Sequence, residues 1–258
     1  MPVDDLSLLT DAAMAAGDIA KKYFRSDFDV VDKPGGQGPV TAADLEIDGM
    51  LKAELLAARP DFGWLSEETE DGVARLDTQK VFIVDPIDGT RAFVAGQKTF
   101  AHSLAIAENG TVVSAVVHLP MRELTYVAKV GHGAFLNGQR LELRSDQDIE
   151  NAQILTAKPQ LHPDLWPGGV PPVQPHFRSS LAYRLCLVAQ GKFDGMITLK
   201  DAWEWDIAAG DLICREAGVV CTDKFGADLK FNVSSAKAAG VLAANPLIHA
   251  GLLHRLQP

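Results

Sequence analysis

The sequence predicts a mixed α+β fold, and three observations along the chain support this. Residues 4–24 and 41–58 have helical patterns, residues 81–143 break into short apolar segments, and the residues after 151 alternate between helix-like and strand-like segments. Helices followed by a sheet region are typical of α+β architecture. With 258 residues, 47% of them hydrophobic, the chain is long enough for one large domain or two tightly packed halves.

Two helices are predicted at the N-terminal end. Residues 4–24 are rich in alanine, carry leucines near helical spacing and begin with acidic residues, which favour a helix N-terminus. A Gly/Pro loop follows over 32–40, and the second helix is predicted over 41–58. Thr41 and Asp44 match a capping box at its start, and this pattern by itself explains Asp44 as a structural residue.

The middle of the chain is predicted to form an antiparallel sheet. Between residues 81 and 143 the segments are short and rich in Val, Leu and Ala. Turn signals separate them at 108–110, 119–121 and 136–138, which indicates strands joined by hairpins.

The C-terminal part is predicted to alternate between strands and helices. The strands are 153–157, 193–199, 219–223 and 238–244, and the helices are 179–191, 205–218 and 246–256. Between the first strand and the first helix, the proline-rich stretch 159–177 is predicted to be an exposed loop.

Composition and charge exclude several classes of partner. The formal net charge is 24 minus 34, or −10, and no basic block stands out, so we do not expect a nucleic-acid partner. No run approaches the roughly 18 apolar residues of a membrane span, and the acidic start lacks the features of a signal peptide. Cys186, Cys214 and Cys221 have no metal-ligand spacing, which favours free thiols in a reducing cytoplasm.

The stretch "VDPIDGTRAF", residues 84–93, places two aspartates where a buried strand ends. Hydrogen bonding within a turn would explain one aspartate, but Asp85 and Asp88 would repel each other unless one took up a proton. A divalent ion such as Mg²⁺ removes this conflict, and the bent backbone can add the Ile87 carbonyl as a ligand. Gly89 lets an anion approach the backbone closely. The pair therefore favours a metal site over a simple turn.

Two more acidic segments suit the same site. "GWLSEETED", residues 63–71, carries Glu67 and Glu68 before the strand, although taken alone this segment is better explained as a solvated acidic loop. "EWDIAAG", residues 204–210, places Asp206 at a predicted helix start, where an N-cap role is the simple structural interpretation. Taken singly, neither segment identifies a function.

Together, "GWLSEE", "VDPIDGTRAF" and "WEWDIAAGDLICREAG" resemble the three signatures of the inositol monophosphatase superfamily of Mg²⁺-dependent, lithium-sensitive phosphatases. The resemblance runs in the family's order from "PVTAAD" to "AGVLAAN". It implies an αβαβα layered sandwich of the inositol monophosphatase and fructose-1,6-bisphosphatase type, usually a homodimer. It also implies an N-terminal half, 1–145, with the antiparallel sheet and most metal ligands, and a C-terminal half, 146–258, with Asp206 and the substrate pocket.

The resemblance assigns the metal ligands for two or three Mg²⁺ ions residue by residue. Glu67 matches a metal-binding glutamate that also counts among the catalytic residues. Asp85 matches the carboxylate that bridges two metals, and the Ile87 carbonyl matches a backbone ligand. Asp88 and Asp206 match ligands of the second metal.

The resemblance also assigns roles around the substrate. Asp44 and Thr90 match the pair that orients and deprotonates the attacking water, and Lys33 lies in the loop that closes over the site in relatives. Apart from the resemblance, the Gly89 and Thr90 amides are expected to hold the phosphate, especially if a helix begins there. The expected substrate-binding residues are Asp88, Gly89, Thr90, Ser180, Lys200 and Asp206.

The substrate stays open at this point. Where inositol-specific relatives carry an acidic residue, this chain has Leu199, followed by Lys200, and Ser179 stands where glycine is usual. The segment "LKDAWEWD" is similar to the branch that removes the 3′-phosphate from adenosine 3′,5′-bisphosphate. An inositol phosphate, a 3′-phosphoadenosine 5′-phosphate type of nucleotide and histidinol phosphate are the alternatives. An interaction protein of the transcription machinery with residual phosphatase activity is a further one.

Some aromatic residues near the motifs have ordinary structural interpretations. His102, His118 and His132 lie in the strand region without metal-ligand spacing and are predicted to be structural. Trp203 and Trp205 flank Glu204, and we expect one to lie in the core and the other to line the pocket.

Overall fold

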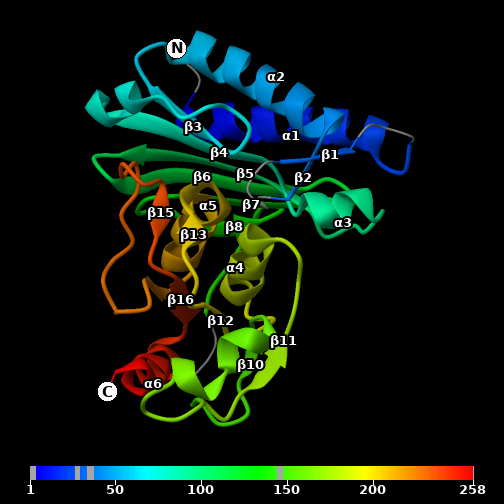
Figure 1. Cartoon of the computed structure of the whole chain (residues 1–258). Coiled ribbons are helices and arrows are strands. Elements are labelled where there is room, and N and C mark those ends of the chain that lie inside the picture. The colour runs from blue at the N-terminus through cyan, green and yellow to red at the C-terminus, as the bar shows by residue number, and fades with distance from the viewer. Residues whose placement is uncertain (1–3, 27–29, 34–37, 144–147, 258) are drawn as a thin grey trace.

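The computed structural model describes residues 4–26, 30–33, 38–143 and 148–257, which form five stacked layers in the order α-β-α-β-α (Figure 1). The predicted layered sandwich is therefore confirmed. The helical layers are α1 (Asp5–Tyr23) with α2 (Ala42–Ala58), then α4 (Leu181–Ala189) with α5 (Glu204–Glu216), and finally α6 (Pro246–Leu256). A short helix, α3 (Thr90–Val94), follows the aspartate motif.

The larger sheet has seven strands in the order β3-β4-β5-β6-β7-β8-β9. Apart from the parallel pair β3 and β4, its neighbours are antiparallel, as predicted for the middle of the chain. The strands are β3 (Gly63–Ser66), β4 (Lys80–Asp88), β5 (Ala101–Glu108), β6 (Thr111–Leu119), β7 (Leu124–Lys129), β8 (Gly133–Leu136) and β9 (Gln139–Arg140).

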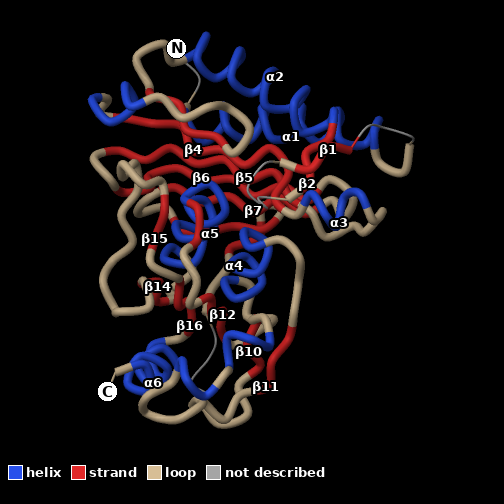
Figure 2. The backbone as a smooth tube through the Cα atoms, in the orientation of Figure 1, coloured by secondary structure: helices blue, strands red, loops and turns tan. Residues whose placement is uncertain are grey.

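The second sheet is mixed and has the order β11-β10-β12-β16-β14. Figure 2 shows it below the larger sheet, between α4 and α5 on one side and α6 on the other. Its strands are β10 (Gln153–Leu155), β11 (Gln174–His176), β12 (Gly195–Thr198), β14 (Val220–Thr222) and β16 (Val241–Ala244). Two small pairs complete the fold, namely β1 (Val30–Asp32) with β2 (Pro39–Thr41), and β13 (Ala202–Trp203) with β15 (Lys237–Ala238).

Apolar side chains fill the spaces between the layers, because the larger sheet is covered on both faces. On β4, Phe82 and Val84 pack toward α1 and α2, whereas Val81 and Ile83 belong to the core shared with α4 and α5. This double burial explains why β4 is a continuous apolar run without polar alternation. The third cluster includes Ile154 and Ile248 and joins the second sheet to α6.

Several local predictions are confirmed. The capping box of Thr41 and Asp44 is present at the start of α2. The hairpins at 108–110 and 136–138 turn through Asn-Gly pairs with positive φ, a conformation that these residues tolerate. The cysteines at 186, 214 and 221 are buried and free. Within the described residues, no helix is long and apolar enough to cross a membrane.

The prediction of an exposed loop over 159–177 is wrong in part. The segment contains two short 3₁₀ turns and ends in β11, and the Trp166 side chain is buried, with its indole N–H donating to the Gln160 carbonyl at 2.9 Å. Proline suggested a loop, but Pro175 is tolerated because β11 is an edge strand. The proposed boundary at 145/146 and residues 34–37 of the predicted Gly/Pro loop lie outside the described residues.

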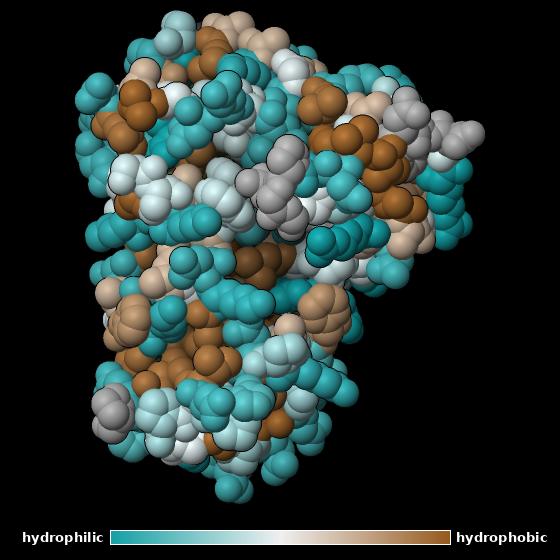
Figure 3. All heavy atoms as spheres, viewed as in Figure 1, coloured by the Kyte–Doolittle hydropathy of each residue, from teal (hydrophilic) through white to brown (hydrophobic). Residues whose placement is uncertain are grey.

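Figure 3 shows a face that is mostly hydrophilic, with apolar side chains gathered in a few places. Phe177 and Phe225 are among the exposed large hydrophobic side chains, at 57% and 68% exposure.

Candidate metal centre

The two aspartates of β4 share one side of the sheet because the strand contains a bulge. In a regular strand, residues three apart point to opposite faces. Here Asp85 pairs with Ser103 and Asp88 with Ala101, so three steps on β4 are matched by two on β5. The extra residue brings Asp88 to the side of Asp85, toward α4 and α5.

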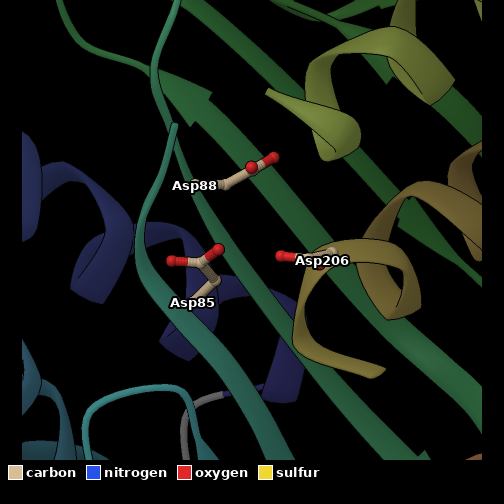
Figure 4. Close-up of side chains that lie close together, drawn as sticks. All are labelled: Asp85, Asp88 and Asp206. Atoms are coloured by element: carbon tan, nitrogen blue, oxygen red, sulfur yellow. The ribbon is translucent and has the colours of Figure 1, made fainter. Parts of the chain in front are cut away.

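Three carboxylates meet at this point. Asp85, Asp88 and Asp206 each offer an oxygen, and these oxygens lie within 4.8 Å of one another. Figure 4 shows Asp85 and Asp88 projecting from β4 and Asp206 from the start of α5 toward a common space. The sequence motifs thus predicted a set of residues that the structure brings together.

The electrostatics of this cluster favour a cation. Neither oxygen of Asp85 has a hydrogen-bond partner in the described part of the chain, although the side chain is only 1% exposed. Burial, followed by repulsion from Glu67 and Asp88, raises the pKa of Asp85 well above its usual range. Burial and repulsion from Asp88 raise the pKa of Asp206 in the same way. A bound divalent cation would relieve both penalties, so these residues fit a metal.

Asp88 is tied to the beginning of α4. Its carboxylate accepts hydrogen bonds from the Ser180 hydroxyl at 2.6 Å and from the amides of Leu181 and Ala182 at 3.2 and 2.6 Å. Burial still raises the pKa of Asp88 to about 6. Ser180, which we expected at the substrate, is fully buried and holds Asp88, whereas the neighbouring Ser179 lines the cavity.

Asp206 lies in the first turn of α5. The residue before the helix is Trp203, so Asp206 is the third helical residue and the N-cap interpretation is wrong. The Ser103 hydroxyl donates to the Trp205 carbonyl at 3.0 Å, which fastens this first turn to β5. The carboxylate of Asp206 is thereby brought opposite the bulge of β4.

Glu67 and Lys33 meet at the edge of the same cavity. Lys33 Nζ lies 2.8 Å from an oxygen of Glu67 and 2.7 Å from an oxygen of Glu68. Glu67 lines the cavity, and burial raises the pKa of Glu68 to about 7. The loop-closing residue predicted from the sequence is therefore in contact with the predicted metal-binding glutamate.

Thr90 and Asp44 are also in contact. The Thr90 hydroxyl lies 3.4 Å from Asp44 Oδ1 and 3.2 Å from the Ile87 carbonyl oxygen. The other oxygen of Asp44 accepts the backbone and hydroxyl hydrogen bonds of Thr41. Burial nevertheless raises the pKa of Asp44 to about 6. Asp44 thus both caps α2 and contacts Thr90.

These groups surround a cavity of about 320 Å³. Its lining residues are Gly38, Pro39, Glu67, Asp85, Asp88, Gly89, Thr90, Arg91, Phe177, Ser179, Trp203, Trp205 and Asp206. Lys200 is exposed and Leu199 is buried in the core against α6, so neither is among them. Both tryptophans line the cavity, and their stacked rings lie 4.5 Å apart between centroids.

Sequence reasoning missed residues that support or line the site. Asp48 accepts hydrogen bonds from Ser66 at 2.5 Å and Thr69 at 2.6 Å, which holds the loop that carries Glu67. Asp48 lies four residues after Asp44 on the same face of the predicted helix, so the sequence could have indicated that both side chains point toward the site. Arg91 lies within the motif of residues 84–93 but was given no role, and no motif pointed to Phe177.

The chain belongs to the inositol monophosphatase family, whose model matches residues 4–258. It is 35% identical over 232 residues to an inositol-1-monophosphatase of Rhizobium meliloti (strain 1021), covering 86% of each chain. It is 30% identical over 263 residues to a protein of Haemophilus influenzae named Nus factor SuhB, covering 98% of this chain and 96% of that one. Members of this family are phosphatases, as the name of the first relative states.

Solved structures agree with the fold. The extragenic suppressor protein suhB from Bartonella henselae matches with a TM-score of 0.83 and 30% identity, over 97% of each chain. A staphylococcal protein crystallised with 2′-AMP has a TM-score of 0.84 at 24% identity, which supports the fold alone.

Proposed function

We propose that this chain is a Mg²⁺-dependent phosphomonoesterase that hydrolyses a small phosphate monoester with water as the nucleophile. One observation carries the proposal. Asp85 keeps two buried oxygens without a partner among the described residues, beside the carboxylates of Asp88 and Asp206. Such a group is unfavourable alone and suits hard cations, which take oxygen ligands. Asp85, Asp88 and Asp206, with Glu67 and the Ile87 carbonyl, would hold the ions.

The residues around the ions have separate tasks. When bound, divalent cations neutralise charge on the phosphoryl oxygens and lower the pKa of an attacking water. The Thr90 hydroxyl orients this water, accepts its proton and passes its own proton to Asp44. A carboxylate whose pKa is raised to about 6 is an effective base near neutral pH. The Gly89 and Thr90 amides, at the start of α3, are proposed to hold the phosphate.

For the leaving group, the cavity lining supports a planar ring and a second anionic group. Phe177 is exposed at the cavity, and the Arg184 guanidinium lies over its ring at 4.5 Å from the centroid. Trp203 and Trp205 form an apolar wall, and Arg91 supplies a cation. These features favour a nucleotide-like monoester over an inositol phosphate, which needs hydrogen-bond acceptors for its hydroxyls.

A substrate panel tests this assignment. We would compare kcat/KM for inositol 1-phosphate, adenosine 3′,5′-bisphosphate, histidinol phosphate and fructose 1,6-bisphosphate. Phe177→Ala should lower kcat/KM for the nucleotide by about 10-fold, since stacking of a base on an aromatic ring is lost. Arg91→Ala should raise KM for both bisphosphates, with Lys200→Ala as the matched control. A preference for inositol 1-phosphate that Phe177→Ala leaves unchanged would contradict the assignment.

A second candidate is a regulatory role on the transcription machinery. Its support is that relatives such as the Haemophilus influenzae protein are named Nus factors. Asp85→Asn removes a proposed metal ligand from a buried position and leaves the surface intact. Retained binding to transcription complexes by this inactive variant would favour the regulatory role, whereas absence of binding by the wild type would exclude it.

Three further properties are proposed from the resemblance to the family, namely binding of two or three Mg²⁺ ions, inhibition by lithium and a homodimeric state. Metal analysis of the dialysed protein, inhibition by LiCl against a KCl control and sedimentation velocity test them in turn. A monomer in sedimentation would remove the dimer without affecting the proposed reaction.

A further inference from the structure

The bulge that brings Asp85 and Asp88 to one side interrupts the regular pairing of β4 with β5, and Pro86 lies within it. Between the pairs Asp85 with Ser103 and Asp88 with Ala101, β4 contributes two residues and β5 only His102. A bulge disrupts the ladder, so backbone groups there lose their regular partners. A buried carbonyl without a hydrogen-bond donor costs free energy. This cost would favour regular pairing of β4 with β5, without the bulge.

The His102 side chain supplies this donor. Its Nδ1 atom lies 2.5 Å from the carbonyl oxygen of Pro86, within the bulge. A carbonyl oxygen only accepts, so the proton belongs to Nδ1 and the ring is the neutral Nδ1–H tautomer. The ring is fully buried, and burial lowers the pKa of His102 to about 3, which keeps it neutral at physiological pH.

We propose that His102 is a positioning residue of the metal centre, because its Nδ1–H holds the Pro86 carbonyl and so fixes the bulge that turns Asp85 and Asp88 to one side. His102 lies opposite the two bulged residues, away from the pair Asp85 and Ser103 that faces α5. It therefore acts through the backbone of β4. The inference rests on the metal centre proposed above.

His118 provides a matched comparison within the same layer. It lies opposite His102 on β6, its ring is stacked 6.1 Å from that of His102 between centroids, and it is 2% exposed. Its Nδ1 contacts the Thr125 hydroxyl at 2.9 Å instead of the bulge. If replacing a buried histidine ring is enough to disturb the metal centre, substitutions at His102 and His118 should both do so. If the hydrogen bond to the bulge matters, only substitution of His102 should do so.

Three variants separate the hydrogen bond from packing. His102→Phe keeps an aromatic ring beside Phe100, whose ring lies 6.1 Å away, but removes the donor. His102→Asn shrinks the side chain and keeps an N–H near the position of Nδ1. His118→Phe is the control. All are made in the full-length chain, and folding is checked by circular dichroism and thermal unfolding in chelator.

The first readout is Mg²⁺ binding measured by calorimetry on metal-free protein. His102→Phe should weaken Mg²⁺ binding by about 10-fold, the scale seen when a residue that orients a metal ligand is lost. His102→Asn should recover most of this loss, and His118→Phe should stay within about 2-fold of the wild type. The Mg²⁺ concentration for half-maximal activity should shift in parallel, while KM at saturating Mg²⁺ stays unchanged.

Two results would overturn the proposal while leaving the phosphatase assignment intact. One is wild-type Mg²⁺ affinity in folded His102→Phe, and the other is an equal loss in His118→Phe, which would indicate packing alone. Absence of Mg²⁺ binding by the wild type would instead contradict the proposed metal centre itself.

A measurement on the wild type covers the case in which the His102 variants do not fold. Two-bond ¹H–¹⁵N correlation spectra of histidine side chains report which ring nitrogen carries the proton. The resonance of His102, assigned from the wild type and His118→Phe, should show a protonated Nδ1 and a bare Nε2. A proton on Nε2 would leave the Pro86 carbonyl without this donor and would contradict the proposal.

Discussion

Asp85 and Glu204 are both buried carboxylates near the cavity, yet their surroundings differ. Glu204, at the start of α5, is fully buried, and its two oxygens accept the backbone N–H groups of Asn232 at 2.6 Å and Val233 at 2.9 Å. Asp85 is almost as buried, but neither of its oxygens has a partner among the described residues. The fold supplies donors for one acid and leaves the other without them.

The difference indicates that Glu204 has a structural role, whereas Asp85 is suited to bind a ligand. A buried charge is tolerated when hydrogen bonds or a counter-ion replace its lost hydration. Glu204 meets this requirement within the chain and fastens the segment around Asn232 to α5. For Asp85 no such group is present among the described residues, and we propose that a bound cation takes this role, so mutations at the two positions should affect different properties.

The largest expected effect is on catalysis at Asp85. Asp85→Asn should lower kcat on a phosphomonoester by on the order of 10³ or more, because the neutral amide is a poor ligand for the bridging position. Steady-state assays at saturating Mg²⁺ measure this change. Wild-type kcat in the variant, or full wild-type activity in excess chelator, would contradict it.

The next effect concerns the proton acceptor. Thr90→Ala and Asp44→Asn should each reduce kcat by about 10²-fold, the usual scale of general base catalysis. Because the two residues act as one unit, the double variant should lose little more than either single variant. Losses that multiply would show that the two side chains act independently.

A smaller effect, on stability, is expected at Glu204. Glu204→Gln should lower the free energy of unfolding by about 1–3 kcal/mol, because two buried N–H groups lose a charged acceptor. Urea unfolding in chelator measures this change, and Mg²⁺ affinity should stay near that of the wild type. A variant with unchanged stability but weakened Mg²⁺ binding would reverse the roles assigned to the two acids.

The last expected effect is on the pH dependence of stability. The pKa of Asp44 is raised to about 6 in the folded protein, above its ordinary value of 3.8. The folded state therefore holds this proton over a range in which the unfolded chain releases it, and stability from Asp44 is lost as pH rises from about 4 to about 6. In chelator, Asp44→Asn should flatten this part of the wild-type curve, and an unchanged slope would contradict the assignment.

The helices, the strands and the Asp85 and Asp88 pair could be predicted from local patterns, whereas the five layers and the full acidic set followed from the resemblance of the motifs to the family. Apolar periodicity identified the helices and strands, and the motifs identified Asp85, Asp88 and Asp206. The sequence did not predict the bulge, because the direction of Asp88 depends on a register shift between β4 and β5. Lys200 was also misplaced by sequence reasoning. It lies close to Asp206 along the chain but does not line the cavity.

The roles of Ser180 and His102 were also beyond sequence reasoning. Their partners, Asp88 and the Pro86 carbonyl, are far away in the chain and are reached only through packing. Ser180 was expected to contact substrate and instead holds Asp88. His102 was predicted to be structural. The structure shows which group it contacts, namely the Pro86 carbonyl within the bulge.

The central claim is that Asp85, whose oxygens have no partner among the described residues, holds divalent cations together with Asp88 and Asp206. Its most direct test is calorimetric titration of the metal-free wild type, Asp85→Asn and Glu204→Gln with Mg²⁺. The account predicts saturable binding to the wild type and Glu204→Gln, and loss of that binding in folded Asp85→Asn. Equal Mg²⁺ binding by Asp85→Asn and the wild type, or no binding by the wild type, would contradict it.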